Sequence, residues 1–254
     1  MNENTKLFST TYHQNNKEII LISKTVIDAS GNWSNFNQLT TQVKEFKQFI
    51  IKGIPSPEKI KNLFIDKSIV IIGNGHSAMN SILLISKHSN AKVSWVIRSN
   101  NTKIGNSKVG GRSKGLEEKI SALILKKNIN LISNFNLSGI SIKKEQLILS
   151  SNNDKKLSEI DFIVQNNGNN ADYSFLKNIP LNLDAKFNVS KRLSQKIDPK
   201  KHSCNTLLYN YEDSKITNLD YFVVGIKSFG KASNFLLRSG YNVLDSLINY
   251  INRL

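Results

Sequence analysis

The sequence predicts an α/β fold with a parallel sheet, and three consecutive segments carry that prediction. Residues 68–72 (SIVII) form a continuous apolar run, which is typical of a parallel strand buried on both faces. A glycine-containing turn follows at 73–78, and apolar residues then recur at helical spacing. Residues 92–98 (KVSWVIR) predict a second strand. Strand, helix and strand fit within roughly 30 residues, the size of one βαβ unit.

The segments before this unit are shorter. Residues 18–22 (EIILI) and 25–29 (TVIDA) predict two short strands on either side of a tight turn at Ser23–Lys24. Residues 32–62 have mixed composition, and two prolines among them indicate a connector.

The segments after the unit alternate between short strands and helices. A polar, glycine-bearing loop is expected over residues 99–115, and residues 171–219 are poorly periodic, so we expect mostly loop with short elements there. The remaining expected elements are a helix at 116–127, a strand at 129–132, a hairpin at 137–149, and strands at 161–165 and 221–225, with a terminal helix at 234–253.

Composition narrows the function classes. The formal net charge is +16, but lysines are spread along the chain and arginine is scarce, so nucleic acid is not the expected partner. No apolar run reaches the roughly 20 residues that span a bilayer, and the first residues lack a signal-peptide profile. The expected location is therefore cytoplasmic. The single cysteine, Cys204, excludes an intrachain disulfide or a CxxC redox pair.

The turn at residues 73–78 has the features of a diphosphate-binding site. Gly73 allows a tight exit from the strand, and Gly75 lets main-chain N–H groups approach a phosphate. Ala78 takes the place of a third glycine and still permits close packing of helix on strand. The helix N-terminus supplies donors and the positive end of a dipole. The predicted cofactor-binding residues of the turn are Gly73, Asn74, Gly75, His76, Ser77 and Ala78.

The end of the second strand favours NADP over NAD. Proteins that bind NAD usually place an acid there for the ribose 2′-hydroxyl, but this chain has Arg98 and Ser99, and no acid before Glu117. A guanidinium at this position suits the 2′-phosphate of NADPH. The alternative for Arg98 is a solvated residue at the end of a strand with no role in binding. The alternative for the glycine turn is a turn in an unrelated α/β protein.

The sequence assigns no catalytic acid or base. For His76 two interpretations stay open, a phosphate contact or a variable residue of the turn. The other histidines, His13, His88 and His202, have no metal-ligand spacing to cysteine or to acidic residues, so no metal site is expected.

The order of segments resembles a known family. The stretch 25–31 (TVIDASG) is similar to the apolar strand and ATG element of flavoproteins with two dinucleotide-binding domains. Residues 161–168, 221–225 (YFVVG), 225–230 (GIKSFG) and 235–241 are similar to later parts of such proteins. The chain resembles the flavin-containing monooxygenase and thioredoxin-reductase-like superfamily, on the monooxygenase-like side because it has no redox cysteine pair.

The resemblance implies a fold, cofactors and a reaction. It implies a Rossmann-like NAD(P)-binding domain at 63–168, inserted in a partial FAD-binding domain formed by 1–62 and 169–254. It also implies an oxidoreductase that transfers hydride from NADPH to FAD and acts on a small-molecule substrate. Backbone groups expected near the cofactors by resemblance belong to Ser30, Gly31, Gly168 and Gly225.

Two departures from the family pattern qualify this expectation. The second ATG-like turn reads Gln165-Asn166-Asn167-Gly168, and the family's N-terminal FAD-binding GxGxxG unit has no counterpart, since the 24 residues before Thr25 contain no glycine. We therefore expect weak FAD binding by this chain alone. The sequence leaves three alternatives: half of a split enzyme completed by a separate chain, a truncated or degenerate product, or a non-catalytic NADP-binding subunit.

Overall fold

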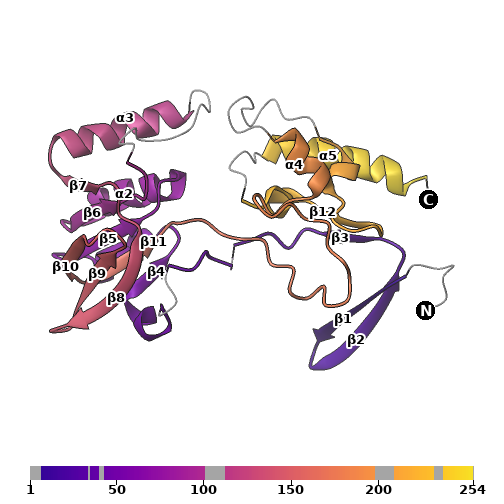
Figure 1. The fold of residues 1–254 in the computed structure, drawn as a ribbon, viewed down its shortest axis with the longest axis horizontal. Helices are drawn as coiled ribbons and strands as arrows, with labels where there is room; N and C mark the ends of the chain where they lie inside the picture. The colour runs from indigo at the N-terminus through magenta and orange to yellow at the C-terminus, as the bar shows by residue number, and fades with distance from the viewer. Residues whose placement is uncertain are drawn as a thin grey trace. The chain divides into compact units, whose positions relative to one another are not determined.

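The computed structural model describes residues 7–33, 35–39, 43–100, 112–197, 209–231 and 237–253. The chain divides into two compact units (Figure 1). Unit 1 is discontinuous and combines Met1–Asn35 with Asn169–Leu254, whereas unit 2 is the continuous segment Phe36–Gly168. We describe each unit by itself.

Unit 2 is built on a five-stranded sheet with the order β4-β11-β5-β6-β7, and every neighbouring pair is parallel. Its central strand β5 is the apolar run that the sequence singles out, and it pairs with β6 as a parallel neighbour. The predicted βαβ arrangement is therefore confirmed. The strands are β4 (Ile50–Lys52), β5 (Ser68–Ile72), β6 (Lys92–Val96), β7 (Ile129–Ile132) and β11 (Phe162–Gln165).

Helices cover one face of this sheet and a small antiparallel sheet covers the other (Figure 1). Successive side chains of a strand point to opposite faces. Ile69 and Ile71 of β5 accordingly pack in the helical layer, while Val70 and Ile72 pack against the antiparallel sheet. The helices are α1 (Pro57–Leu63), α2 (His76–His88) and α3 (Arg112–Leu125), and the antiparallel strands are β8 (Leu137–Lys143), β9 (Gln146–Ser151) and β10 (Lys156–Ile160).

The region that the sequence suggests as a connector, 32–62, contributes to unit 2. A 3-10 helix, η1 (Val43–Phe49), leads into β4 at the edge of the parallel sheet. Helix α1 begins at Ser56, whose side chain accepts a hydrogen bond from the N–H of Lys59 at 3.2 Å, and Pro57 occupies its first turn. Unit 2 thus begins at Phe36, earlier than residue 63, because β4 and α1 pack on its sheet.

Unit 1 contains a hairpin and a separate pair of parallel strands. β1 (Phe8–Gln14) and β2 (Lys17–Ser23) are antiparallel, with Asn15 and Asn16 in the left-handed region at the turn. β3 (Val26–Asp28) instead pairs in parallel with β12 (Tyr221–Val223). The two predicted short strands correspond to β2 and β3, with Ser23 and Lys24 at their junction, but the two strands do not pair with each other. The hairpin turn of unit 1 lies at Asn15 and Asn16, which tolerate positive φ.

The C-terminal part of unit 1 has short helices around β12. These are α4 (Lys191–Lys196), η2 (Tyr211–Ser214) and η3 (Gly225–Phe229), followed by α5 (Leu237–Ile251). The predicted terminal helix is confirmed as α5 over Leu237–Ile251, and residues 234–236 of the predicted range lie outside the described residues. Apolar side chains of α4, β12, η3 and α5 form one core, which includes Leu193, Phe222, Phe229, Val243 and Leu247.

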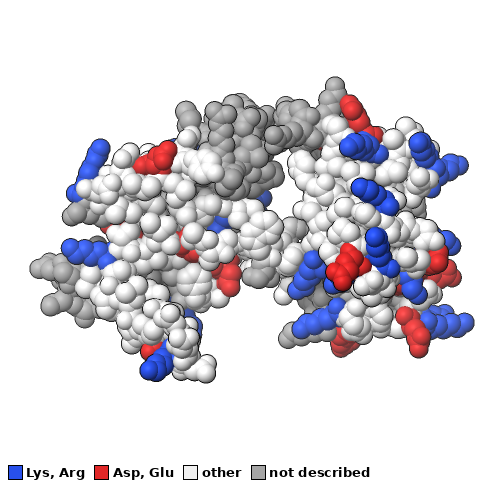
Figure 2. Space-filling model, turned by 180° about the vertical axis from the view of Figure 1, so that it is seen from behind, with Lys and Arg blue, Asp and Glu red and all other residues white. Residues whose placement is uncertain are grey.

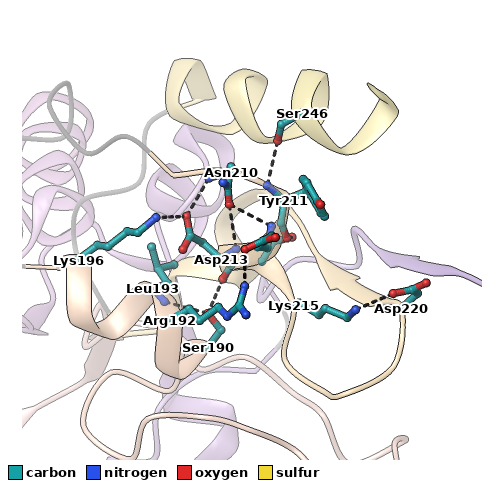
Figure 3. Close-up of polar contacts among 12 residues, drawn as sticks. Ser190, Arg192, Leu193, Lys196, Asn210, Tyr211, Asp213, Lys215, Asp220 and Ser246 are labelled. Carbon is teal, nitrogen blue, oxygen red and sulfur yellow. Dashed lines mark hydrogen bonds and ion pairs between the residues drawn. The ribbon is translucent and has the colours of Figure 1, made fainter. Parts of the chain in front are cut away.

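A polar network holds α4, η2 and α5 together (Figure 3). Asp213 is 3% exposed and accepts hydrogen bonds from the ammonium of Lys196 at 2.6 Å and the N–H of Asn210 at 2.9 Å. The N–H of Tyr211 donates to the hydroxyl of Ser246 on α5 at 2.9 Å. Both donors reach the same oxygen, Oδ2, so the buried Asp213 carboxylate has a cationic partner and a main-chain partner that offset the cost of its burial.

Lysine and arginine side chains do not form one continuous patch on the face seen in Figure 2. Uncharged surface and acidic side chains separate them. Within the described ranges, no helix combines the length and hydropathy needed to cross a membrane.

Candidate dinucleotide-binding site

Gly73 holds the glycine turn against both neighbouring strands. It follows β5 with a φ of +135°, its N–H donates to the carbonyl of Val96 at 3.2 Å, and its carbonyl accepts from the indole N–H of Trp95 at 2.6 Å. A Cβ at this position would lie 2.1 Å from the carbonyl oxygen of Asn166, just after β11. Glycine is therefore required at residue 73 by space and by backbone conformation.

Gly75 has the opposite environment. It is the N-cap of α2, and a Cβ at this position would meet nothing within 4 Å. The first N–H groups of a helix have no acceptor within the helix, and the dipole favours an anion there. Ala78, one turn later, is fully buried in the helical layer of the core. The turn therefore combines an open approach to main-chain donors with close packing behind it, as a diphosphate site needs.

His76 and Ser77 are exposed in the first turn of α2. This exposure is compatible with both interpretations of His76, and the contacts of the two side chains with a phosphate remain predictions.

The main chain beyond β6 lies beside that beyond β7. The N–H of Ile97 donates to the carbonyl of Ile132 at 2.9 Å, and the N–H of Asn134 donates to the carbonyl of Ser99 at 3.1 Å. Arg98 lies between these bonded residues, and its side chain is exposed. The guanidinium thus belongs to the strand next to the glycine turn, at the carboxyl edge of the sheet, where parallel α/β sheets bind ligands.

Two buried amide groups flank the glycine turn with unused hydrogen-bonding capacity. The side chain of Asn166 contacts the hydroxyl of Ser81 on α2 at 3.0 Å. In the described part of the chain, the other end of that amide and the side-chain oxygen of Asn74 are buried without a partner. Buried polar atoms are seldom left unpaired. Both unpaired atoms are amide oxygens, so they could pair only with a hydrogen-bond donor and not with the oxygens of a diphosphate.

The second ATG-like turn is tied to the start of unit 2. Gly168 has a φ of +86°, and its carbonyl accepts from the N–H of Asn37 at 3.0 Å. The side-chain amide of Gln165 donates to the carbonyl of Asn37 at 2.6 Å, and that of Asn37 donates to the carbonyl of Asn167 at 2.9 Å. Gly168 therefore lies in an ordered turn, and its contact with a cofactor remains a prediction.

Unit 1 brings together the other predicted cofactor residues. Ser30 and Gly31 follow β3, Gly225 follows β12, and β3 and β12 are parallel neighbours. Gly31 and Gly225 have φ values of +71° and +70°, and a Cβ on Gly225 would meet nothing within 4 Å. Both turns thus lie at the carboxyl ends of parallel strands, where the main chain at Gly225 is open to a ligand.

A buried ion pair that the sequence analysis did not single out lies at these same strand ends. The ammonium of Lys227 is 2.7 Å from the carboxylate of Asp28, and their side chains are 1% and 4% exposed. The carboxylate also accepts from the hydroxyl of Tyr221 at 2.8 Å and from the N–H and hydroxyl of Ser30 at 3.0 and 2.7 Å. The sequence signal that could have revealed this ion pair is the charged residue at the end of the apolar strand VID.

The surroundings of Asp28 explain the protonation states in this cluster. Burial by itself would raise the pKa of Asp28, but bonds from Lys227, Ser30 and Tyr221 outweigh it and hold that pKa below its ordinary value. Burial and the Asp28 carboxylate raise the pKa values of Tyr173 and Tyr221 above the usual tyrosine range. Asp28 is therefore an anion and both tyrosines are neutral at ordinary pH.

The two units fit the two expected cofactors differently. Unit 2 fits a dinucleotide diphosphate, because the open N-cap Gly75 gives access to helix N–H groups. Unit 1 fits a ligand that contacts the main-chain atoms of Gly225 and of the Ser30–Gly31 turn. In the part of unit 1 that the structure describes, β3 and β12 do not lead into a glycine turn that opens an α-helix.

Two residues of the sequence analysis, Cys204 and His202, lie outside the described residues. Among the residues that are described, no group of three or more histidine, cysteine or acidic side chains is placed to hold a metal ion.

Solved structures share this fold. Bacillithiol disulfide reductase Bdr (YpdA) from Bacillus cereus matches with a TM-score of 0.73 at 18% identity, over 99% of this chain and 69% of that one. Thioredoxin reductase from T. acidophilum matches with a TM-score of 0.61 at 15% identity, over 97% and 74%. The flavoprotein disulfide reductase RclA from Escherichia coli, as its Cu(II) complex, matches with a TM-score of 0.63 at 13% identity, over 94% and 48%.

No curated protein matches the sequence. The model of one protein family, described as pyridine nucleotide-disulphide oxidoreductase, matches residues 4–206, which is most of the chain. The mixed α/β architecture and the parallel sheet agree with that match. The chain therefore belongs to the pyridine nucleotide-disulphide oxidoreductase family of FAD- and NAD(P)-dependent flavoproteins.

Proposed function

We propose that this protein is an NADPH-dependent flavoprotein oxidoreductase in which unit 2 binds NADPH and unit 1 forms part of the FAD-binding region. Family membership supports redox activity with FAD and NAD(P)H. The observation that carries the NADPH assignment is the open N-cap at Gly75, which lies between parallel neighbours β5 and β6, with the exposed Arg98 beyond β6. A guanidinium there favours the 2′-phosphate of NADPH.

Within this proposal the chain's own residues bind and orient the nucleotide. The first-turn N–H groups of α2 hold the diphosphate, Gly73 fixes the turn to β6, and Arg98 selects the phosphorylated ribose. The chemistry that FAD supplies in such proteins is acceptance of a hydride and delivery of electrons to oxygen or another acceptor.

We place the activity on the monooxygenase-like side of the family. The solved neighbours named above are disulfide reductases, but the 254 residues of this chain hold one cysteine, Cys204, and so cannot form a dithiol relay by themselves. The proposed electron acceptor is therefore oxygen with a small-molecule substrate, rather than a cysteine pair of this chain.

Nucleotide titration of two glycine variants tests the proposal. Gly75→Val adds a side chain into open space, so the fold should persist, but the diphosphate approach is blocked. We expect NADPH affinity to fall at least tenfold by isothermal titration calorimetry. Gly139→Val is the matched control, because a Cβ there also meets nothing within 4 Å and β8 lies in the antiparallel sheet. Unchanged NADPH affinity in Gly75→Val would contradict the assignment.

A second candidate is a non-catalytic NADP-binding subunit that does not hold FAD alone. It is favoured by the absence of a diphosphate cradle after β3 or β12 within the described residues of unit 1. A separate chain would then complete the FAD site. The two candidates separate in one titration of the purified chain with FAD: saturable quenching of flavin fluorescence supports the first, and NADPH binding without it supports the second.

A further inference from the structure

We propose that Lys227 is a positioning residue that fixes the Ser30–Gly31 turn and Gly225 in the arrangement that receives the flavin cofactor. This inference rests on the proposed FAD-binding role of unit 1. It assigns to the buried Asp28–Lys227 pair a role in ligand binding beyond the packing of the fold.

The first step is the unusual state of the Lys227 ammonium. Lys227 is the one lysine or arginine among the described residues that is buried, at 1% exposure. Taking an ammonium out of water costs several kcal/mol unless its hydrogen bonds are replaced. Here Nζ contacts the Asp28 carboxylate at 2.7 Å and donates to the Ser30 hydroxyl at 2.9 Å. It also lies 4.8 Å from the ring centroids of both Tyr173 and Phe175.

The second step is that the network ends on the turn itself. The Ser30 hydroxyl accepts from Lys227 and donates to Asp28, while the Ser30 N–H donates to the same carboxylate oxygen. The ammonium therefore bonds the Ser30 side chain directly, and it acts on the Ser30 main chain only through the Asp28 carboxylate. Gly31 follows at once with a φ of +71°, so the direction in which the chain leaves β3 is set by this cluster.

The third step is the position of Lys227 in η3, two residues after Gly225. The hydroxyl of Ser228 donates to the carbonyl of Gly225 at 2.8 Å, and the N–H of Gly230 donates to the carbonyl of Lys227. Anchoring Lys227 to β3 therefore also anchors η3, and with it the open side of Gly225. β3 and β12 lie side by side (Figure 1), so one ammonium ties together the exits of both strands.

The alternative is an ion pair that serves stability alone, and charge-neutral replacement distinguishes the two roles. Lys227→Met leaves the Asp28 carboxylate buried and unpaired, which is strongly destabilising. Asp28→Asn/Lys227→Met removes both charges and keeps similar volumes, so stability should largely return. The double variant still lacks the hydrogen bond from Lys227 to the Ser30 hydroxyl. If Lys227 is a positioning residue, FAD affinity should therefore stay low even though stability returns.

The test uses the full chain and three measurements: the melting temperature, NADPH affinity by calorimetry, and FAD affinity by flavin fluorescence. For Asp28→Asn/Lys227→Met we expect a melting temperature close to that of the wild type, NADPH affinity within twofold, and FAD affinity lowered at least tenfold. Lys215→Met is the control, because it breaks a half-buried ion pair with Asp220 in the same unit, and it should leave FAD affinity unchanged.

Two results would overturn the inference: FAD affinity within twofold of the wild type in the double variant, or no saturable FAD binding by the wild-type chain. If the wild-type chain binds NADPH but not FAD, the proposed NADPH site in unit 2 still stands. If it binds FAD but not NADPH, only the proposed NADPH site is overturned. If the double variant does not fold, Ser30→Ala decides: at least threefold weaker FAD binding with normal NADPH binding supports positioning, and unchanged FAD binding contradicts it.

Discussion

The indole of Trp95 donates its N–H to the carbonyl of Gly73 at 2.6 Å, and this bond joins the body of β6 to the turn that opens α2. Trp95 is fully buried, so the donor of this bond belongs to the core, while Gly73 is only partly buried. A core side chain thereby fixes the main chain that would face a diphosphate, which links the packing of the sheet directly to nucleotide binding.

Trp95→Phe should weaken both the fold and the site. The variant keeps an aromatic ring but leaves the Gly73 carbonyl without its donor, which costs about 1–3 kcal/mol. We expect that loss in the free energy of unfolding measured in urea, together with weaker NADPH binding. Trp33→Phe is the matched control, since Trp33 is 77% exposed, and a similar loss in that variant would contradict the role of the Trp95 bond.

Gly73→Ala should destabilise the protein far more than a glycine substitution in open space. Its Cβ would overlap the carbonyl of Asn166, and its φ of +135° is strained for alanine. Steric overlap and backbone strain together predict a loss of about 2–4 kcal/mol in the free energy of unfolding. Gly139→Ala, measured in the same urea titration, should change it little. Equal stability of the two variants would show that the turn can shift without penalty.

Arg98→Gln should reduce the preference for NADPH over NADH. Loss of a charge-assisted bond to the 2′-phosphate is worth about 1.5–3 kcal/mol, or roughly 10- to 100-fold in affinity. NADH affinity should stay the same, because NADH carries no such phosphate. The exposed Lys92, at the opposite end of β6, provides the control Lys92→Gln. If both nucleotides lose affinity equally, Arg98 does not read the 2′-phosphate.

The burial of Tyr209 should make the free energy of unfolding depend on pH in the alkaline range. Burial and the nearby Asp213 carboxylate raise the pKa of Tyr209 from 10.0 to about 12. The unfolded chain releases this proton at a lower pH than the folded one, so the stabilisation is complete below pH 10 and is lost as pH rises towards 12. Tyr209→Phe should therefore flatten the decline of stability over this range, measured by urea unfolding, whereas Tyr241→Phe, at a 54% exposed side chain, should not.

The core of the site could be predicted from sequence because its signals are local. The apolar run at 68–72, the glycine turn and the next strand are contiguous, and together they specify β5, α2 and β6. The hairpin at 137–149 is likewise confirmed as β8 and β9. Short apolar runs, the glycine turn and helical periodicity, all of them local patterns, sufficed for these elements.

Features that depend on distant residues could not be predicted in this way. β3 was expected as a short strand, but the sequence did not indicate its partner β12, which lies near the other end of the chain. The Asp28–Lys227 pair depends on that same pairing, so neither charge had a visible partner in the sequence. β10 was missed because Lys156–Ile160 (KLSEI) has little apolar content and an irregular register with β9.

The discontinuity of unit 1 has a consequence for biosynthesis. Residues 36–168 contain every strand of the five-stranded sheet, so this segment can acquire its core while the rest is still being translated. Strand β3 must wait, since it has no neighbour until β12 leaves the ribosome, and Asp28 has no counter-ion until Lys227 is made. The nascent chain therefore carries the exposed apolar strand β2 and an unpaired β3 through most of its synthesis, a period in which chaperone binding would protect it from aggregation.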